Sequence, residues 1–222
     1  MTFVILFPAL MSAANTEEPI LFESGGLQLE GLLWRGKPGG EACILCHPHP
    51  QYGGSMHNNV VGAMATALQG EGVSTLRFNF RGVGNSHGRF GNGLEERLDV
   101  EAAIDAIETQ MSPGEIHVGG YSFGAQVGLF VASVDSRVDG LVGVAPPLSL
   151  YDFGFLRKST QEKLLIAGAE DLFCPPGRLR EWFDSLKEPK TLEIIPQADH
   201  FFRNHEDALK SAVRAYFRLR SS

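Results

Sequence analysis

Ser122 lies at the centre of a short glycine-flanked segment that could present a nucleophile. The segment Gly120-Tyr121-Ser122-Phe123-Gly124 follows the apolar run Ile116 to Val118 and precedes the helix-like stretch Ala125 to Ser133. A strand, a sharp turn and a helix in this order form the setting of a nucleophile elbow. Glycines on both sides leave room for a strained turn, and the strain lifts the serine hydroxyl clear of the sheet. Ser122 is therefore the leading candidate nucleophile.

A serine hydroxyl needs a base within hydrogen-bond reach, because it is a weak nucleophile at neutral pH. Only two histidines follow Ser122 in the sequence, His200 and His205. His200 comes shortly after a predicted strand that ends at Ile195, whereas His205 is expected to begin the last helix. We therefore expect His200 to be the base.

The base in turn needs an acid that holds it in the right tautomer. Asp171 lies between the serine and the histidine in sequence and follows a predicted strand. Glu170 is its nearest rival. Asp199 is adjacent to the base, and because neighbouring residues usually diverge we assign it to the loop. The alternative interpretation of Asp171 is an ordinary loop aspartate in an Asx turn.

Acyl transfer also needs N–H donors aimed at the developing oxyanion. The backbone N–H of Phe123, the residue after the serine, is expected to supply one. A second should come from the loop after the strand predicted at residues 43–47. Pro48 and Pro50 have no N–H there. Gln51 is the first choice for this donor and His49 the second.

With these residues in place, the chain resembles the small, lidless, dienelactone-hydrolase-like and carboxylesterase-like group of α/β-hydrolases, from about Leu21 to the C-terminus. The resemblance implies an α/β-hydrolase fold with Ser122 as nucleophile, Asp171 as acid and His200 as base. Many relatives have an aliphatic residue where this chain has Gln51, a change that keeps the backbone donor but alters the pocket wall. The matching segments are residues 47–50 with the glycine pair 53–54, then 78–84, 120–124, 151–153 and 199–202.

The elements that must position these residues alternate along the chain. A hairpin is expected from Pro19 to Trp34 around Gly25-Gly26. The alternation predicts a mainly parallel twisted sheet with helices on both faces, in which ligands bind beyond the carboxyl ends of the strands. After the hairpin, the expected strands are residues 43–47, 74–80, 116–121, 140–144, 163–167 and 191–195, and the expected helices are residues 59–69, 94–109, 125–133, 178–186 and 206–219.

One helix also has a predicted buried face. In the helix expected at residues 94–109, apolar side chains recur at helical spacings, with acids toward the other side. We expect this face to pack on the sheet. Its members are Leu94, Leu98, Ala102, Ile104 and Ile107.

The chain has no room for a cap domain over the site. The segment from Ala145 to Glu162, where lipases and epoxide hydrolases with a cap insert it, is long enough only for a loop with one short turn. Ser122 should therefore face an open cleft, which favours short-chain esters or thioesters. The expected reaction is acylation of Ser122 and deacylation by water that His200 activates, without a cofactor. A thioesterase, lactonase or peptidase would use the same residues, and a non-catalytic hydrolase-like protein would use the cleft for binding.

Two further features lie near the expected site. Arg81 follows the strand predicted at residues 74–80 and either binds a substrate carboxylate or ties loops together by hydrogen bonds. We favour the second interpretation. Tyr151, Asp152 and Phe153 either line the mouth of the site or plug the core, and the sequence favours neither.

Composition is that of a soluble globular protein, with 43% hydrophobic and 20% charged residues. At 222 residues, we expect one domain over residues 19–222 after an N-terminal extension at residues 1–18. The net charge of −7 with no dense Lys/Arg block excludes nucleic acid and anionic membrane surfaces as expected partners. A small-molecule ester or thioester is the expected partner, bound by a monomer or homodimer.

The cysteines and the histidine-rich loop give no metal prediction. Cys43 and Cys46 share one predicted strand, where a spacing of three turns them to opposite faces, and no second cysteine pair exists. His47 and His49 lack a suitably spaced carboxylate or third histidine, so we expect no zinc there. Unpaired cysteines indicate a reducing compartment, which we take to be the cytoplasm.

The N-terminus, Met1 to Ala14, is apolar and ends in small residues, which is superficially like a secretory signal. It lacks the basic region that begins such signals. We favour a disordered or loosely docked extension, or an edge strand through Val4 to Phe7 that is stopped by Pro8. No other segment approaches the roughly 18 apolar residues needed to span a bilayer.

Overall fold

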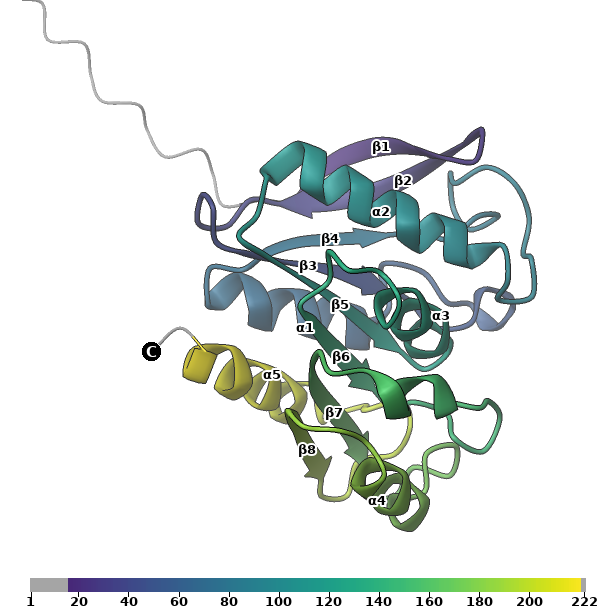
Figure 1. Cartoon of the computed structure of the whole chain (residues 1–222). Helices are drawn as coiled ribbons and strands as arrows, with labels where there is room; N and C mark the ends of the chain where they lie inside the picture. The colour runs from purple at the N-terminus through teal and green to yellow at the C-terminus, as the bar shows by residue number, and fades with distance from the viewer. Residues whose placement is uncertain (1–15, 221–222) are drawn as a thin grey trace, which may run out of the picture.

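A computed structural model describes residues 16–220, so the edge strand predicted at Val4 to Phe7 lies outside the described residues. The described chain contains one eight-stranded sheet in the order β1-β2-β4-β3-β5-β6-β7-β8 (Figure 1). β1 pairs antiparallel with β2 and β2 antiparallel with β4, and all later pairs are parallel. The strands are β1 (Glu18–Ser24), β2 (Leu27–Trp34), β3 (Glu41–Cys46), β4 (Ser74–Phe78), β5 (Glu115–Tyr121), β6 (Gly140–Val144), β7 (Glu162–Gly168) and β8 (Lys190–Ile195).

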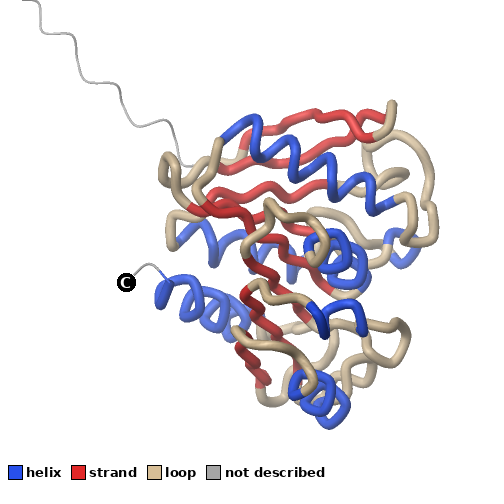
Figure 2. The backbone as a smooth tube through the Cα atoms, in the orientation of Figure 1, coloured by secondary structure: helices blue, strands red, loops and turns tan. Residues whose placement is uncertain are grey.

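Helices cover both faces of this sheet, which confirms the predicted α/β architecture (Figure 2). α2, α3 and α4 contribute to one apolar cluster, and α1 and α5 to a second cluster on the other face. Cys46 belongs to the first cluster and Cys43 to the second, as their spacing in β3 predicts. The helices are α1 (Asn59–Gly70), α2 (Glu96–Met111), α3 (Phe123–Ala132), α4 (Pro176–Asp184) and α5 (Glu206–Arg220), with 3-10 turns η1 (Pro50–Tyr52) and η2 (Gly154–Lys158).

Burial along the strands follows their place in the sheet. From Ala42 to Cys46, β3 is buried at every residue, because helices cover both of its faces. β1 is an edge strand, and exposed and covered residues alternate along most of it. None of the helices within residues 16–220 has both the length and the apolar character required to cross a membrane.

The predicted buried face of α2 is partly wrong. Leu94 precedes the helix and is 66% exposed, and Leu98 is 48% exposed. The acids Glu96 and Asp99 are buried, although the sequence predicts acids on the other side of this helix. The apolar side chains buried against the sheet are Val100, Ala103, Ile104 and Ile107. They follow the i, i+3, i+4, i+7 spacing of one helix face, and the two leucines lie on a different face. The sequence alone does not indicate which side of a helix the sheet will cover.

Two predicted boundaries also shift where the site begins. α3 starts at Phe123 rather than Ala125, because the helix follows the strained residue Ser122 directly. β4 ends at Phe78 rather than Phe80, whose N–H donates to the His47 ring instead of to a neighbouring strand. The connection between β6 and β7 spans residues 145–161 and contains only η2, so no cap domain covers this edge of the sheet.

Candidate active site

Ser122 occupies a strained turn between β5 and α3. Its φ of 55° and ψ of −117° lie in a region that residues with a side chain rarely adopt. A Cβ at Gly120 would lie 2.3 Å from the Gly124 carbonyl oxygen, and one at Gly124 would lie 2.2 Å from the Cys46 carbonyl oxygen. Both contacts are with backbone atoms, so the turn requires glycine at both positions.

The three predicted polar residues meet at the carboxyl ends of β5, β7 and β8. Ser122 Oγ lies 3.0 Å from His200 Nε2. His200 Nδ1 lies 2.8 Å from Asp171 Oδ2. Because these strands are parallel, the loops after them emerge at the same edge of the sheet. A serine, a histidine and a carboxylate joined in this way can transfer the serine proton to the imidazole.

Asp171 is held by its own loop. Its carboxylate is buried, and Oδ1 accepts hydrogen bonds from the N–H groups of Phe173 and Cys174, both at 2.8 Å. Oδ2 is then left to face His200. The loop-aspartate interpretation and the acid interpretation therefore apply to different oxygens of one side chain. The rivals do not reach the base: Glu170 is exposed, and Asp199 accepts a hydrogen bond from the Phe201 N–H in its own loop.

Two residues that support His200 were not recognised in the sequence. The Tyr121 hydroxyl donates to the His200 carbonyl oxygen at 2.9 Å, and burial raises the pKa of Tyr121, so it stays a neutral donor. The ring of Phe173 lies 4.8 Å from the His200 ring, centroid to centroid. Tyr121 belongs to the serine pentapeptide and Phe173 to the turn after Asp171, so their proximity in sequence to predicted site residues was the available signal.

The loop after β3 forms η1 and brings His49 against the start of α3. The His49 ring packs among the rings of Tyr52, Phe90 and Phe123, with centroids 4.8 to 4.9 Å apart. Its Nδ1 accepts a hydrogen bond from the Gln51 N–H at 3.2 Å. Phe123 is the first residue of α3, so its N–H lies ahead of the helical hydrogen-bond ladder. The Gln51 N–H, one of the two predicted oxyanion donors, therefore already donates to an acceptor within its own loop.

His47 joins two loops rather than facing the site. Its Nδ1 lies 2.6 Å from the Pro48 carbonyl oxygen, and its Nε2 accepts a hydrogen bond from the Phe80 N–H at 3.1 Å. Burial lowers the pKa of His47 to about 4, so the imidazole is neutral and Nδ1 is the donor. With both nitrogens used inside the protein, His47 ties the loop after β3 to the loop after β4.

Arg81 has the structural role that we favoured. Its guanidinium forms a buried ion pair with Asp99, at 2.7 Å, and a second pair with Glu95. The backbone N–H of Arg81 also donates to Asp99, and Asp99 accepts a further hydrogen bond from the Ser24 hydroxyl. The donors of Arg81 are directed at these partners, so the residue links the end of β4 to α2 and to the first hairpin.

Both interpretations of the segment at residues 151–153 apply in part. Phe153 is buried in the core and packs against Trp182, with ring centroids 5.6 Å apart. The Tyr151 ring lies 6.5 Å from the Phe123 ring, beside the elbow. This segment and the facing surface of α4 line a cavity of about 450 Å³, whose wall includes Arg157 and Arg178.

Large apolar side chains stand exposed in the loops at the edge of the sheet that carries Ser122. They come from four different loops, those after β3, β6, β7 and β8. The residues and their exposed fractions are Tyr52 at 86%, Leu150 at 61%, Leu172 at 85% and Phe201 at 48%. We call these four residues the apolar rim. All four belong to loops at the carboxyl ends of the strands, the same end as Ser122.

Comparison with known proteins identifies the family of this chain. The chain matches the family model of the alpha/beta hydrolase fold over residues 44–162, and that of PhoPQ-activated pathogenicity-related proteins over residues 128–222. An alpha-beta serine hydrolase homologue from Coxiella burnetii superposes with a TM-score of 0.84 at 34% identity, over 92% of this chain and 99% of that one.

Two further proteins are similar to this chain. An alpha/beta serine hydrolase without lid from Xanthomonas campestris superposes with a TM-score of 0.82 at 30% identity, over 97% of each chain. A thiohydrolase from Arthrinium phaeospermum is 30% identical over 133 residues, which are 58% of this chain and 42% of that protein. The first family model covers more than half of the chain, and the two serine-hydrolase structures match nearly all of it. The chain therefore belongs to the alpha/beta hydrolase family.

Proposed function

We propose that this hydrolase cleaves carboxylic esters through an acyl-enzyme on Ser122. The observation that carries the proposal is the continuous hydrogen-bonded line from Ser122 through His200 to Asp171. His200 Nε2 accepts the Ser122 proton while Oγ attacks the ester carbonyl carbon. Asp171 Oδ2 accepts the His200 Nδ1 proton and stabilises the imidazolium that forms.

The tetrahedral intermediate carries its negative charge on the former carbonyl oxygen. The Phe123 N–H donates to this oxyanion. The Gln51 N–H is the second donor in this proposal, after it leaves its hydrogen bond to His49 Nδ1. His200 then gives its proton to the leaving alcohol oxygen, and the C–O bond breaks. Water enters, His200 takes one of its protons, and the hydroxide attacks the acyl carbon. His200 then returns that proton to Ser122 Oγ as the bond between Oγ and the acyl carbon breaks, which releases the acid and restores the Ser122 hydroxyl.

Short-chain esters are the proposed substrates. The connection at residues 145–161 builds no cap, so an acyl chain has no enclosed tunnel formed by an inserted domain. The apolar rim supplies contacts for a small acyl or alcohol group instead. Thioesters are the second candidate class, because the similar fungal protein is a thiohydrolase and the acyl-enzyme would be the same.

Fluorophosphonate labelling tests the nucleophile. The wild-type protein should take up one label per chain at Ser122, and the Ser122→Ala variant, with an unchanged melting temperature, should take up none. Folded wild-type protein that stays unlabelled would overturn the proposal. A binding protein without activity would instead show ligand affinity unaffected by Ser122→Ala and no turnover above that variant.

Hydrolysis of p-nitrophenyl esters from acetate to palmitate tests the substrate class. We expect kcat/KM to be highest for short acyl chains and to fall as the chain lengthens past the reach of the rim. An optimum at palmitate would contradict the open cleft. The same acyl group presented as a thioester ranks the second candidate directly, since a higher kcat/KM for the thioester would assign thioesterase activity.

A further inference from the structure

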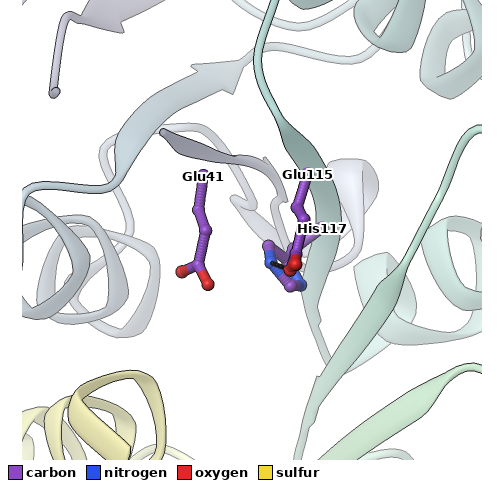
Figure 3. A group of neighbouring side chains, drawn as sticks. All are labelled: Glu41, Glu115 and His117. Carbon is purple, nitrogen blue, oxygen red and sulfur yellow. Dashed lines mark ion pairs between the residues drawn. The ribbon is translucent and has the colours of Figure 1, made fainter. Parts of the chain in front are cut away.

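Three side chains of types that bind metal ions meet at the amino ends of β3 and β5, the opposite end of the strands from Ser122. Glu41 opens β3, while Glu115 opens β5 and is followed two residues later by His117. β3 and β5 are neighbours, and Glu41 is the direct register partner of Glu115. One ligand atom from each side chain lies within 4.8 Å of the others. Figure 3 shows the Glu115 carboxylate beside the His117 ring, with the Glu41 carboxylate directed to the same side of the two strands.

His117 is buried without a hydrogen-bond partner. Its side chain is 0% exposed, and neither ring nitrogen has a partner among the described residues. Nδ1 faces Gly140, where an added Cβ would lie 2.3 Å from it. Nε2 faces the carboxylates and lies 3.6 Å from Glu115 Oε2. A buried imidazole with no partner is costly and rare, so it indicates a ligand for Nε2.

Other unpaired polar atoms gather at the same place. Glu41 Oε2 is buried and has no partner in residues 16–220. The Tyr216 hydroxyl, on α5, is also unpaired within that range. The Tyr216 ring lies beside Arg220, whose guanidinium carbon is 5.9 Å from the ring centroid. Four of the seven unpaired buried side-chain atoms found in the described chain thus belong to His117, Glu41 and Tyr216.

Several carboxylates share one guanidinium at these strand ends. Three carboxylates, those of Glu41, Glu115 and Glu162, pair with the single guanidinium of Arg220. Arg220 Nε lies 3.4 Å from Glu41 Oε1, so the unpaired oxygen of Glu41 is the other one.

We propose that Glu41, Glu115 and His117 form a binding site for a divalent transition metal, with Zn²⁺ as the best-matched ion. Imidazole and carboxylate ligands suit Zn²⁺, whereas Mg²⁺ and Ca²⁺ prefer oxygen alone. Zinc bonds of about 2.0 to 2.2 Å require ligand atoms about 3.3 Å apart, so each side chain needs to move by only about an ångström. The fourth position is left to water or to the Tyr216 hydroxyl.

The site fastens β3 to β5, and it adjoins α5 through Arg220. It lies at the amino ends of these strands, whereas Ser122 and its partners follow the carboxyl ends, so the metal is structural and takes no part in ester cleavage. Arg220 competes with the ion for the same carboxylates. Removing its charge should therefore strengthen metal binding while weakening the metal-free protein.

Zinc titration of the full chain, stripped with a chelator, tests the site. Calorimetry should show one ion per chain. The melting temperature should rise by about 5 °C or more at a hundredfold excess of Zn²⁺ over Kd. No binding of Zn²⁺, or binding without a rise in melting temperature, would overturn the proposal.

Substitutions then locate the ion. Glu115→Gln should abolish the zinc-dependent rise, and because Glu115 is half exposed the variant should fold even if His117→Gln does not. Glu162→Gln is the matched control, since it removes a neighbouring carboxylate but no proposed ligand, and it should keep one ion per chain. Arg220→Gln should melt below the wild type without metal and recover on zinc addition. Unchanged zinc binding in Glu115→Gln would rule the site out.

Discussion

The two oxygens of the Asp171 carboxylate have different hydrogen-bond partners. Oδ1 accepts two backbone N–H groups from the turn that follows, and this fixes the side chain so that Oδ2 points at His200 Nδ1. A carboxylate with one oxygen anchored in this way has a single orientation. The His200 ring is consequently positioned by a turn in the backbone as much as by a charge.

Replacing Asp171 by Asn should inactivate the enzyme while preserving the fold. The N–H groups of Phe173 and Cys174 select the amide oxygen at the Oδ1 position, which turns the NH₂ group toward His200 Nδ1. His200 must then accept at Nδ1 and carry its proton on Nε2, the wrong tautomer for a base. We expect kcat to fall about 10⁴-fold. Steady-state kinetics with a p-nitrophenyl ester measure this, and Glu170→Gln should retain wild-type kcat.

The second oxyanion donor can be isolated by removing one N–H. Gln51→Pro deletes the backbone donor, whereas Gln51→Leu keeps it and changes only the side chain. If the Gln51 N–H binds the oxyanion, kcat should fall about 10²- to 10³-fold in the proline variant and stay within a few-fold of wild type in the leucine variant. Equal kcat values for the two variants would move the role to another residue of the loop, with His49 next in line.

At the scale of elements, the elbow depends on how closely α3 approaches β3 and β5. Gly124 sits against the Cys46 carbonyl at the end of β3, and Gly120 sits against the first turn of α3 itself. The strand, the turn and the helix are packed backbone to backbone. This contact, rather than the helix alone, holds Ser122 at its positive φ.

A pair of Gly→Ala substitutions separates this contact from ordinary helix propensity. Gly124→Ala places a Cβ 2.2 Å from the Cys46 carbonyl oxygen, so the backbone must move, and we expect a loss of about 3 kcal/mol in the free energy of unfolding. Gly62→Ala, at the fourth residue of α1, adds a Cβ with no atom within 4 Å and should stabilise the protein by about 1 kcal/mol. Urea denaturation monitored by circular dichroism gives both values. A Gly124→Ala variant as stable as the wild type would refute the backbone contact.

At the scale of the whole molecule, the sheet separates two regions of different chemistry. The carboxyl ends of the parallel strands carry Ser122, Asp171 and His200, and the amino ends carry the carboxylates around Arg220. Between them lie two apolar layers, one on each face. His47 and His117 are buried near opposite ends of the strands, and burial lowers the pKa of both. Low pH should therefore destabilise the fold at both ends of the sheet.

Stability should decline as the pH falls below about 6.5. The pKa of His47 is lowered from 6.5 in the unfolded chain to about 4 in the folded protein. Between these values the unfolded state binds a proton that the folded state does not. The free energy of unfolding therefore falls with decreasing pH, by about 1.4 kcal/mol per unit for this group. Urea denaturation at pH 7, 6 and 5 measures the slope, and His47→Gln should show a shallower one; an identical slope would exclude His47 as its source.

Much of the fold was predictable, because local patterns report it. Alternating apolar runs and amphipathic stretches gave the order of elements, and the glycine-flanked serine gave the elbow, since the steric demand of that turn acts on adjacent residues. The predictions failed where a neighbour distant in sequence decides. Leu94 and Leu98 fit an apolar face by spacing, yet only the position of the sheet relative to α2 determines which face is covered.

The sequence by itself determined the residue types of the candidate site and their order, Ser122, then Asp171, then His200, because each follows a strand that its own neighbours specify. Only the tertiary structure decided the rest. The hydrogen bond from the Tyr121 hydroxyl to the His200 carbonyl oxygen and the meeting of Glu41, Glu115, His117 and Arg220 depend on which strands lie side by side. Strand order is a property of long-range packing, and no local spacing in the chain encodes it.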